Sequence, residues 1–356
     1  MGCCEATNPD LAGVVSYEGD ELKWDRRTTL KALVGMAGVV AVTAGGPRVS
    51  AAATKLRLAF CGQLLCVVPY EVTRARGHFG DQDLDVELVY TRGGNAAMQA
   101  LVGGAVDYAG TSFDVALQAF ANGAPIRRFA STGRLPLFAL AVGPKRSQEI
   151  KAVKELQGRT VGVSALGNAD HVLLQFLLEQ AGVDAKKVRY AAIGTNVFDA
   201  LRLGHVDAAM VQEPALSLTV KAGGRELVNF MDIEQARKHL GGPYEFMGVS
   251  VRAKERDQRL PEMRRLAIAL KKGLADTRAI SPDEIIAALP KPLVAGGDTA
   301  QLKEIIARYR ESLYPQNVTI DVAAAQRVVK SQEVAEVLQP GKVDLKALLD
   351  TAALEG

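Results

Sequence analysis

Short apolar runs alternate with longer stretches of helical periodicity along the first half of the chain. Runs in which polar and apolar residues alternate predict strands, and stretches that end at glycine predict helices. The predicted strands cover residues 55–60, 85–90, 106–112, 127–132 and 138–144. The predicted helices cover residues 67–79, 93–104 and 113–123. This order favours a mostly parallel sheet with helices on both faces.

The same order begins again after residue 150. Strands are predicted at residues 159–163, 188–193, 206–214, 225–230 and 244–254. Helices are predicted at residues 169–182, 196–204 and 215–224. The remainder to residue 356 is mostly helical in pattern, with examples at 260–280 and 298–314. The chain therefore reads as two α/β units followed by helices.

One short phrase occurs once in each unit. The segments "GNAAMQALVGGAVDYAGT" and "GTNVFDALRLGHVDAAMV" share the pattern Ala-Leu-x-x-Gly-x-Val-Asp-x-Ala at an offset of one hundred residues. We interpret the pattern as structural. Gly104 and Gly204 end helices, at positions that favour a left-handed backbone conformation. Asp107 and Asp207 make turn hydrogen bonds at the start of a strand.

Length and composition narrow the class of protein. A chain of 356 residues suggests two domains, and 48% hydrophobic with 23% charged residues is typical of a soluble globular protein. The formal net charge is only +3, no long basic run is present, and aromatic residues make up 5%. This balance argues against a nucleic-acid partner.

The first 53 residues have the layout of an export signal. Arg26 and Arg27 precede Leu30-Lys31, an apolar run at 32–44, and small residues up to Ala53. The run is too short for a bilayer span, which needs about 20 residues. The arginine pair resembles the twin-arginine export motif, although Asp25 and Thr29 depart from it. We expect cleavage near Ala53 and a periplasmic location.

No catalytic or cofactor motif stands out. The chain has no G-x-S-x-G, no phosphate-binding G-x-x-x-x-G-K-[ST], no G-x-G-x-x-G after a strand and no H-E-x-x-H. Its four histidines are scattered, so we expect no metal site and no catalytic residue. Cys61 and Cys66 form either a short-loop disulfide or a pair of free, partly buried thiols.

Small polar residues gather instead where the predicted strands end. Ligands of open α/β sheets bind at such carboxyl ends, beside helix N-termini that suit anions and oxygen-rich groups. The candidate ligand-binding residues are Gly62, Gln63, Gly94, Asn95, Thr111, Ser112, Ser164, Gly167, Asn168, His171, Thr195, Asn196, Gln212 and Glu213. We expect them to face one another across a cleft between two lobes.

Three segments, "DVELVYTRGGNAAMQALVGGAVDYAGTS", "LQGRTVGVSALG" and "DALRLGHVDAAMVQEPAL", together with "YEFMGVSV", resemble the periplasmic solute-binding proteins of ABC importers. The likeness is to the branch for nitrate, sulfonates, taurine and thiamine-pyrimidine precursors. It implies a type II binding-protein fold with two hinge crossovers. The first lobe would comprise 55–139 and 249–356, and the second lobe 140–248. It also implies a membrane permease as partner, a monomer, no cofactor and no enzymatic activity.

The resemblance ranks three classes of solute but does not identify a single one. A sulfonate or taurine-like solute comes first, nitrate or another small oxyanion second, and a pyrimidine-type heterocycle third. Glu213 facing an amine would fit a zwitterion, whereas Glu213, Asp114 and Asp170 would repel a bare anion unless Arg134 or backbone N–H groups offset them. The alternative is an enzyme on the same fold, related to pyrimidine synthesis.

Overall fold

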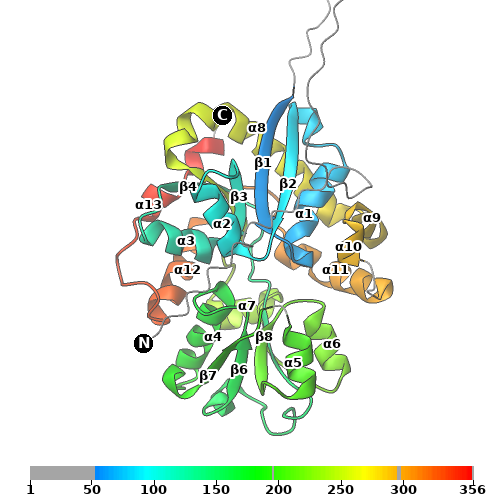
Figure 1. Cartoon of the computed structure of the whole chain (residues 1–356), viewed down its shortest axis with the longest axis vertical. Coiled ribbons are helices and arrows are strands. Elements are labelled where there is room, and N and C mark those ends of the chain that lie inside the picture. The colour runs from blue at the N-terminus through cyan, green and yellow to red at the C-terminus, as the bar shows by residue number, and fades with distance from the viewer. Residues whose placement is uncertain (1–52, 195, 295–297, 355–356) are drawn as a thin grey trace, which may run out of the picture.

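The computed structural model describes residues 53–194, 196–294 and 298–354. They form two lobes, one above the other, as the ribbon in Figure 1 shows. Each lobe contains one five-stranded sheet flanked by helices. We call the lobe with the N-terminal sheet the first lobe and the other the second lobe. The export-signal prediction for residues 1–52 lies outside the described residues.

The first sheet has the order β2-β1-β3-β10-β4. Its strands are β1 (Thr54–Cys61), β2 (Leu84–Thr91), β3 (Tyr108–Ser112), β4 (Ile126–Ser131) and β10 (Met247–Arg252). The second sheet has the order β7-β6-β8-β5-β9. Its strands are β5 (Ala139–Val142), β6 (Thr160–Val163), β7 (Arg189–Ala192), β8 (Ala208–Val211) and β9 (Arg225–Asn229).

Both sheets are mostly parallel, as the sequence predicted, and each contains one strand that runs against the other four. β1, β2 and β3 run parallel, as do β6, β7 and β8. β10 runs antiparallel to β3 and β4, and β5 runs antiparallel to β8 and β9. The cause is strand exchange: β5 and β10 each follow a crossover from the other lobe and enter their sheet in the opposite direction.

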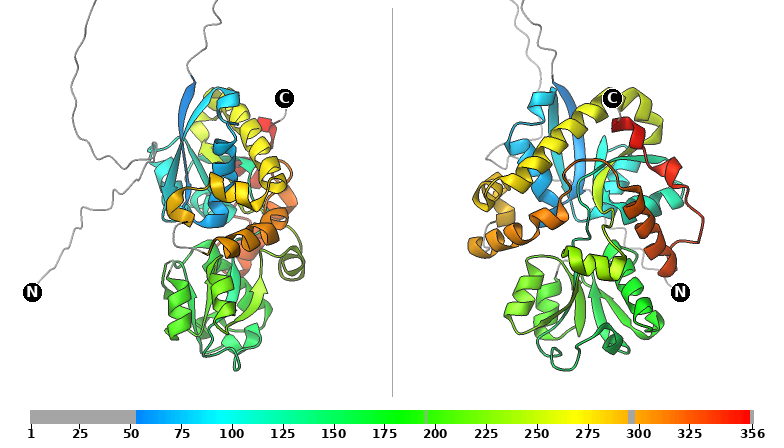
Figure 2. Two further views of the ribbon diagram at one scale, coloured as in Figure 1. Left: turned by 90° about the vertical axis from the view of Figure 1, so that its right-hand side faces the viewer. Right: turned by 180° about the vertical axis from the view of Figure 1, so that it is seen from behind.

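Most helices lie where the sequence predicted them. The first lobe carries α1 (Leu64–Ala75), α2 (Gly94–Val102), α3 (Phe113–Ala121), α8 (Arg256–Ala279), α9 (Pro282–Ala288), α10 (Lys291–Val294), α11 (Thr299–Leu313), α12 (Val322–Val334) and α13 (Leu345–Leu348). The second lobe carries α4 (Ala169–Gln180), α5 (Val197–Leu203), α6 (Ala215–Lys221) and α7 (Ile233–Leu240). Two views from other sides show α11 and α12 reaching down toward the second lobe (Figure 2).

The long C-terminal helix α8 is anchored on α1 by close backbone approach. Gly273 of α8 lies against Thr73 of α1, where an added Cβ would stand 1.8 Å from the threonine hydroxyl oxygen. A side chain at position 273 is therefore excluded at the present helix spacing. Within the described residues, no helix is long and apolar enough to span a membrane.

Candidate functional site

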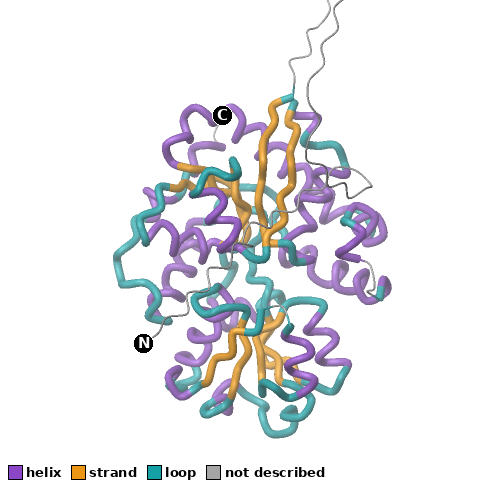
Figure 3. The backbone as a smooth tube through the Cα atoms, viewed as in Figure 1, coloured by secondary structure: helices purple, strands orange, loops and turns teal. Residues whose placement is uncertain are grey.

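A cavity of about 300 Å³ lies between the lobes, at the carboxyl ends of the parallel strands. In the tube of Figure 3, strands of both sheets point toward the region where the two lobes meet and pass into loops there. We call it the inter-lobe cavity. β1 ends at Cys61 and β3 at Ser112, and both residues line it from the first lobe. Ser164 and Gln212, which directly follow β6 and β8, line it from the second lobe.

Four helices begin at this cavity. The residues that precede α1, α2, α3 and α4 are Gln63, Gly93, Ser112 and Asn168, and all four line it. Only Ser112 caps its helix with its side chain, by accepting from the N–H of Val115 at 3.4 Å. Helix N-termini carry free N–H donors and partial positive charge, so four of them around one space favour an anion or an oxygen-rich group.

Asp170 organises the loop of the second lobe. Its carboxylate is buried and accepts from the backbone N–H of Ser164 at 2.5 Å and from the Ser164 hydroxyl at 2.8 Å. Asn168 donates from Nδ2 to the same hydroxyl oxygen at 2.9 Å. Burial raises the pKa of Asp170, against these hydrogen bonds. The carboxylate thus holds the loop in place beside the cavity.

A buried guanidinium supports the wall of the first lobe. Arg128 of β4 is fully buried and donates to the carbonyl oxygens of Thr111 at 2.9 Å and Phe246 at 2.8 Å. Thr111 and Phe246 line the cavity. The carboxylate of Glu245 lies 3.7 Å from the guanidinium group of Arg128. Burial raises the pKa of Glu245 to about 7. Arg128 therefore places positive charge directly behind the wall.

The rest of the cavity wall is apolar and sulfur-bearing. Phe138 and Phe246, one from each crossover, meet edge to face with ring centroids 5.9 Å apart. Met247 and Val115 add apolar surface. The site therefore offers polar helix ends on one side and an apolar surface for a hydrocarbon or ring on the other.

Cys61 and Cys66 are free, buried thiols that line the cavity. Hydrogen bonding from Cys66 lowers the pKa of Cys61, while the same interaction and burial raise the pKa of Cys66. Of the two alternatives from the sequence, the structure has the free thiols rather than the disulfide.

Two hydrogen bonds join the lobes along one edge of the cavity. Asn95 of α2 donates from its amide to the side-chain oxygen of Asn168. Gln118 of α3 donates to the carbonyl oxygen of Gly167 at 3.0 Å. Both contacts link the first lobe to the loop before α4. The cavity is therefore covered on this side.

The structure brings together most of the residues expected at the site. The expected residues that line the cavity are Gln63, Gly94, Asn95, Thr111, Ser112, Ser164, Asn168 and Gln212. Gly62, Gly167, His171, Asn196 and Glu213 do not line it. Thr195 lies outside the described residues.

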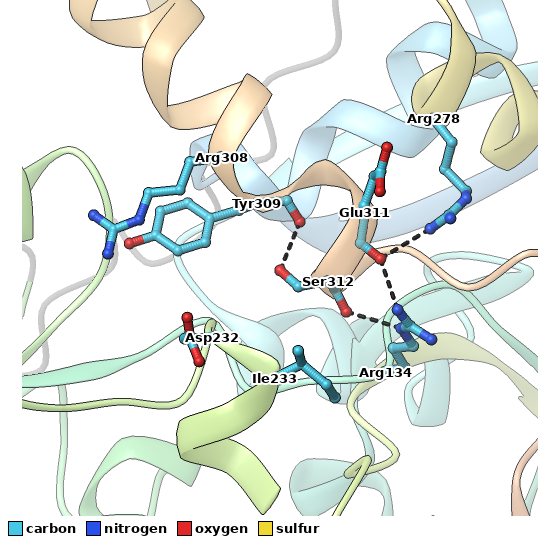
Figure 4. A pocket seen from close by; sticks show the side chains of 8 residues that line it. All are labelled: Arg134, Asp232, Ile233, Arg278, Arg308, Tyr309, Glu311 and Ser312. Atoms are coloured by element: carbon cyan, nitrogen blue, oxygen red, sulfur yellow. Dashed lines mark hydrogen bonds between the residues drawn. The ribbon is translucent and has the colours of Figure 1, made fainter.

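Two of the residues outside the cavity have structural partners. Glu213 accepts from the N–H and the hydroxyl of Ser217, at 3.0 and 2.9 Å, and thereby holds the start of α6. His171 accepts at Nδ1 from the N–H of Gly167 and packs edge-on to Tyr190, with ring centroids 4.7 Å apart. Burial lowers the pKa of His171 and raises that of Glu213. Arg134, considered above as a balancing charge, lies in a different cavity (Figure 4).

Several lining residues were not expected from the sequence. Arg92 stands exposed at the rim, and Phe138, Phe246 and Met247 come from the crossovers. The glycines that follow Arg92 pointed to this loop, but nothing in the pattern singled out the arginine. The crossover residues look like ordinary core residues in the sequence. No cluster of metal-ligating His, Cys, Asp or Glu occurs in the described part of the chain.

A family model described as "NMT1/THI5 like" matches residues 67–284, more than half of the chain. The chain belongs to the NMT1/THI5-like family. The matched range includes both sheets except for β1, and most of the residues that line the inter-lobe cavity. No curated protein matches the chain.

Solved structures share the fold. A protein from Bordetella bronchiseptica RB50 is 26% identical, with a TM-score of 0.75, covering 85% of this chain and 96% of that one. The aliphatic sulphonate-binding protein SsuA from Escherichia coli is 20% identical, with a TM-score of 0.62, covering 82% and 96%. The nitrate-binding protein NrtA from Synechocystis PCC 6803 is 13% identical, with a TM-score of 0.68, covering 84% and 87%. The type II periplasmic-binding-protein fold expected from the sequence is confirmed.

Proposed function

We propose that this protein is the extracytoplasmic solute-binding component of an ABC importer and that it captures a small organic anion in the inter-lobe cavity. The observation that carries the proposal is the convergence of four helix N-termini on one cavity that also has an apolar wall. The helix ends suit an anionic head group, and Phe138, Phe246 and Met247 suit an attached hydrocarbon.

An aliphatic sulfonate fits this division better than nitrate. A sulfonate presents three oxygens to the helix ends and a hydrocarbon tail to the aromatic side. Nitrate has no apolar part, so it would leave the wall formed by Phe138 and Phe246 without a partner. Arg128 behind the wall and Arg92 at the rim add positive charge. SsuA, a sulphonate-binding protein, and NrtA, a nitrate-binding protein, share this fold, and this supports an anionic solute.

The remaining elements of the proposal follow the expectations from the sequence. The first lobe comprises 55–139 and 249–356, and the second lobe 140–248. The protein is exported by the twin-arginine route, acts as a monomer without a cofactor and delivers its solute to a membrane permease. The lobes close around the solute by a hinge motion of the two crossovers.

A pyrimidine-type ligand is the second candidate. The family description and the pair of aromatic rings favour it, because a heterocycle can pack against the surface that Phe138 and Phe246 form together. A catalytic role on this ligand would require turnover. Incubation with the pyrimidine and analysis by mass spectrometry distinguishes binding from reaction, because binding returns the ligand unchanged.

The test is a thermal-shift screen of the purified chain against ethanesulfonate, taurine, nitrate and a thiamine-precursor pyrimidine. A ligand at 100 times its Kd stabilises the folded state by about 2.7 kcal/mol. We expect ethanesulfonate to shift the melting temperature most. Asn168→Ala should reduce that shift, whereas Asp199→Ala, on the exposed face of α5, should not. If none of the four compounds shifts the melting temperature, the proposed solute class is wrong.

A further inference from the structure

Two free thiols, those of Cys61 and Cys66, lie in the wall of the inter-lobe cavity, and the proposed function makes no use of them. Cys61 is the last residue of β1, and Cys66 lies in the first turn of α1. Only residues 62–65 separate them, so both side chains come from the turn that leads from the first sheet into its first helix. We call them the thiol pair.

The two thiols interact with each other. Both residues are buried, with exposed fractions of 8% for Cys61 and 3% for Cys66. A side-chain hydrogen bond joins them, and it lowers the pKa of Cys61 while it raises the pKa of Cys66. Opposite shifts of this kind mean that Cys66 donates its proton to the sulfur of Cys61. The thiol pair is therefore one unit rather than two separate cysteines.

The start of α1 adds a second donor to the sulfur of Cys61. The backbone N–H of Gln63, the residue before α1, is hydrogen-bonded to this sulfur and lowers the pKa of Cys61 further. Burial, in contrast, raises the pKa of Cys66. Because the thiolate is the nucleophile in thiol–disulfide exchange, Cys61 is the thiol that attacks first and Cys66 the one that follows.

The buried hydroxyl groups near the thiol pair have other partners. The charge of Cys66 acts on Tyr70 and on Tyr314, so both rings lie close to it. The hydroxyl of Tyr70 is hydrogen-bonded to that of Thr132 at 3.1 Å. The hydroxyl of Tyr314 donates to the carbonyl oxygen of Leu65 at 2.8 Å. Neither bond ties up a sulfur atom, which leaves the two thiols available to react with each other.

We propose that Cys61 and Cys66 form a redox-active site, which a small disulfide that enters the inter-lobe cavity converts to an intramolecular disulfide. The Cys61 thiolate attacks one sulfur of the disulfide RSSR, forms a mixed disulfide and releases one RS⁻. The Cys66 thiolate then attacks the Sγ of Cys61, forms the bond between the two cysteines and displaces the second RS⁻. The two RS⁻ take up the two thiol protons, so the protein loses two electrons and RSSR becomes two RSH.

Oxidation changes the cavity in which we place the solute. The new bond closes a ring over residues 61–66, which include Gln63 at the start of α1, and it removes two thiol donors from the wall. A solute in the cavity should in turn shield the thiol pair from the incoming disulfide. These two consequences rest on the proposed function, whereas the chemistry of the thiol pair does not depend on which solute binds.

The test is mass analysis of the purified full chain after reduction, removal of the reductant and incubation with oxidised glutathione. Remaining thiols are alkylated with iodoacetamide before digestion. Trypsin cleaves after Arg57 and Arg74, so one peptide, residues 58–74, carries both members of the thiol pair, and Cys3 and Cys4 fall in another. We expect the 58–74 peptide to escape alkylation and to lose two hydrogen atoms, which dithiothreitol restores.

The same incubation of the chain unfolded in urea controls for the activity of the reagent. Two alkylated cysteines in the 58–74 peptide of the folded chain, under conditions that oxidise the unfolded chain, refute the proposal. A glutathione adduct that persists on the wild-type peptide also refutes it, because the second thiol should displace the glutathione.

Single serine variants test the order of attack. Cys66→Ser should stop at a glutathione adduct on Cys61. Cys61→Ser should form its adduct at least tenfold more slowly, because burial keeps the remaining thiol protonated. Equal rates of adduct formation in the two folded variants would contradict the role of Cys61 as the attacking thiol.

The failure of this proposal can be told apart from failure of the proposed function. Saturating ethanesulfonate should slow oxidation of the 58–74 peptide at least fivefold. If ethanesulfonate shifts the melting temperature but the peptide is never oxidised, the redox site is wrong and the solute proposal stands. If the peptide is oxidised and no compound of the screen shifts the melting temperature, the solute class is wrong and the redox site stands.

Discussion

Asp107 and Asp207 make the same pair of backbone contacts in the two lobes. Asp107 accepts from the N–H of Arg57 at 2.7 Å, and Asp207 accepts from the N–H of Thr160 at 2.9 Å. Each aspartate also donates its own N–H to the carbonyl oxygen of that same residue, at 3.0 and 2.9 Å. The repeated sequence pattern therefore encodes one structural feature, used twice, in which the residue before a strand is hydrogen-bonded to the neighbouring parallel strand.

Removing this feature should destabilise the protein without affecting the solute cavity. In Asp207→Ala the half-buried N–H of Thr160 loses its acceptor, which costs about 1 kcal/mol, the lower end of the range for a buried unpaired donor. We expect a lower urea midpoint for Asp207→Ala and for Asp107→Ala. Asp199→Ala is the control, because Asp199 is exposed and pairs only with Arg202 on its own helix. Equal midpoints for Asp207→Ala and Asp199→Ala would contradict the assignment.

Glu213 should matter for stability rather than for solute affinity. Its carboxylate bonds Ser217 at the start of α6, and it does not line the inter-lobe cavity. Glu213→Ala should lower the melting temperature and leave the ethanesulfonate shift intact. Loss of that shift in a folded Glu213→Ala protein would instead support the ligand-binding role that the sequence suggested for Glu213. Ser217→Ala, which removes only the hydroxyl donor, should have a smaller effect of the same kind.

Gly273→Ala should destabilise the packing of α8 on α1. An added methyl group would overlap the side chain of Thr73, and overpacking typically costs about 1–3 kcal/mol. This exceeds the gain of about 1 kcal/mol from replacing glycine within a helix. Thermal melts of Gly273→Ala and Gly80→Ala give the comparison, since nothing lies within 4 Å of a Cβ at Gly80. A melting temperature for Gly273→Ala at or above that of the wild type would refute the packing.

Asp114 should make stability fall as the pH rises. Burial raises its pKa to about 7, against partial compensation by the hydrogen bond from Tyr244 at 2.9 Å. The folded state thus keeps a proton on Asp114 that the unfolded state releases near pH 4. The contribution of this proton to the free energy of unfolding is therefore lost between about pH 4 and 7. With each pH unit worth about 1.4 kcal/mol, the full effect is up to about 4 kcal/mol.

Asp114→Asn removes this dependence at one site. Urea unfolding at pH 4 and pH 8 should show that the free energy of unfolding of the variant, relative to that of the wild type, is greater at pH 8 than at pH 4. Asp199→Asn, measured at the same two pH values, is the comparison for an exposed carboxyl group. A difference between Asp114→Asn and wild type that stays constant with pH would contradict the buried, protonated state.

Most strands and helices followed from periodicity and glycine positions. Gly204, with φ of 76°, ends α5 in the left-handed conformation that the repeated phrase predicted. The antiparallel entry of β5 and β10 did not follow, because the pattern of a single strand carries no information on its direction in the sheet. α7 was missed as well: it is short and mostly polar, and its clearest signal is the cap at Asp232.

The sequence predicted those residues of the site that local sequence patterns mark. Helix-start residues such as Ser112 and Asn168 show themselves by their position after a strand. Phe138 and Phe246 reach the cavity only because the crossovers bring them there, which is a tertiary effect. The sequence also did not show that the Glu213 side chain points away from the cavity. Its hydrogen bond with Ser217 depends on the path of the chain into α6.

The exchange of β10 sets an order of events during synthesis of the chain. β4 is hydrogen-bonded in the sheet only to β10 among the described strands, yet β10 is made after the whole second lobe. The second sheet, from β5 to β9, is continuous in sequence and can form without it. A nascent chain that has emerged only as far as β9 therefore carries every strand of the second sheet, whereas β3 and β4 of the first sheet still lack the strand that lies between them. The topology thus allows the second sheet to form before the first, whose strands β3 and β4 gain the neighbour between them only after β10 has been made.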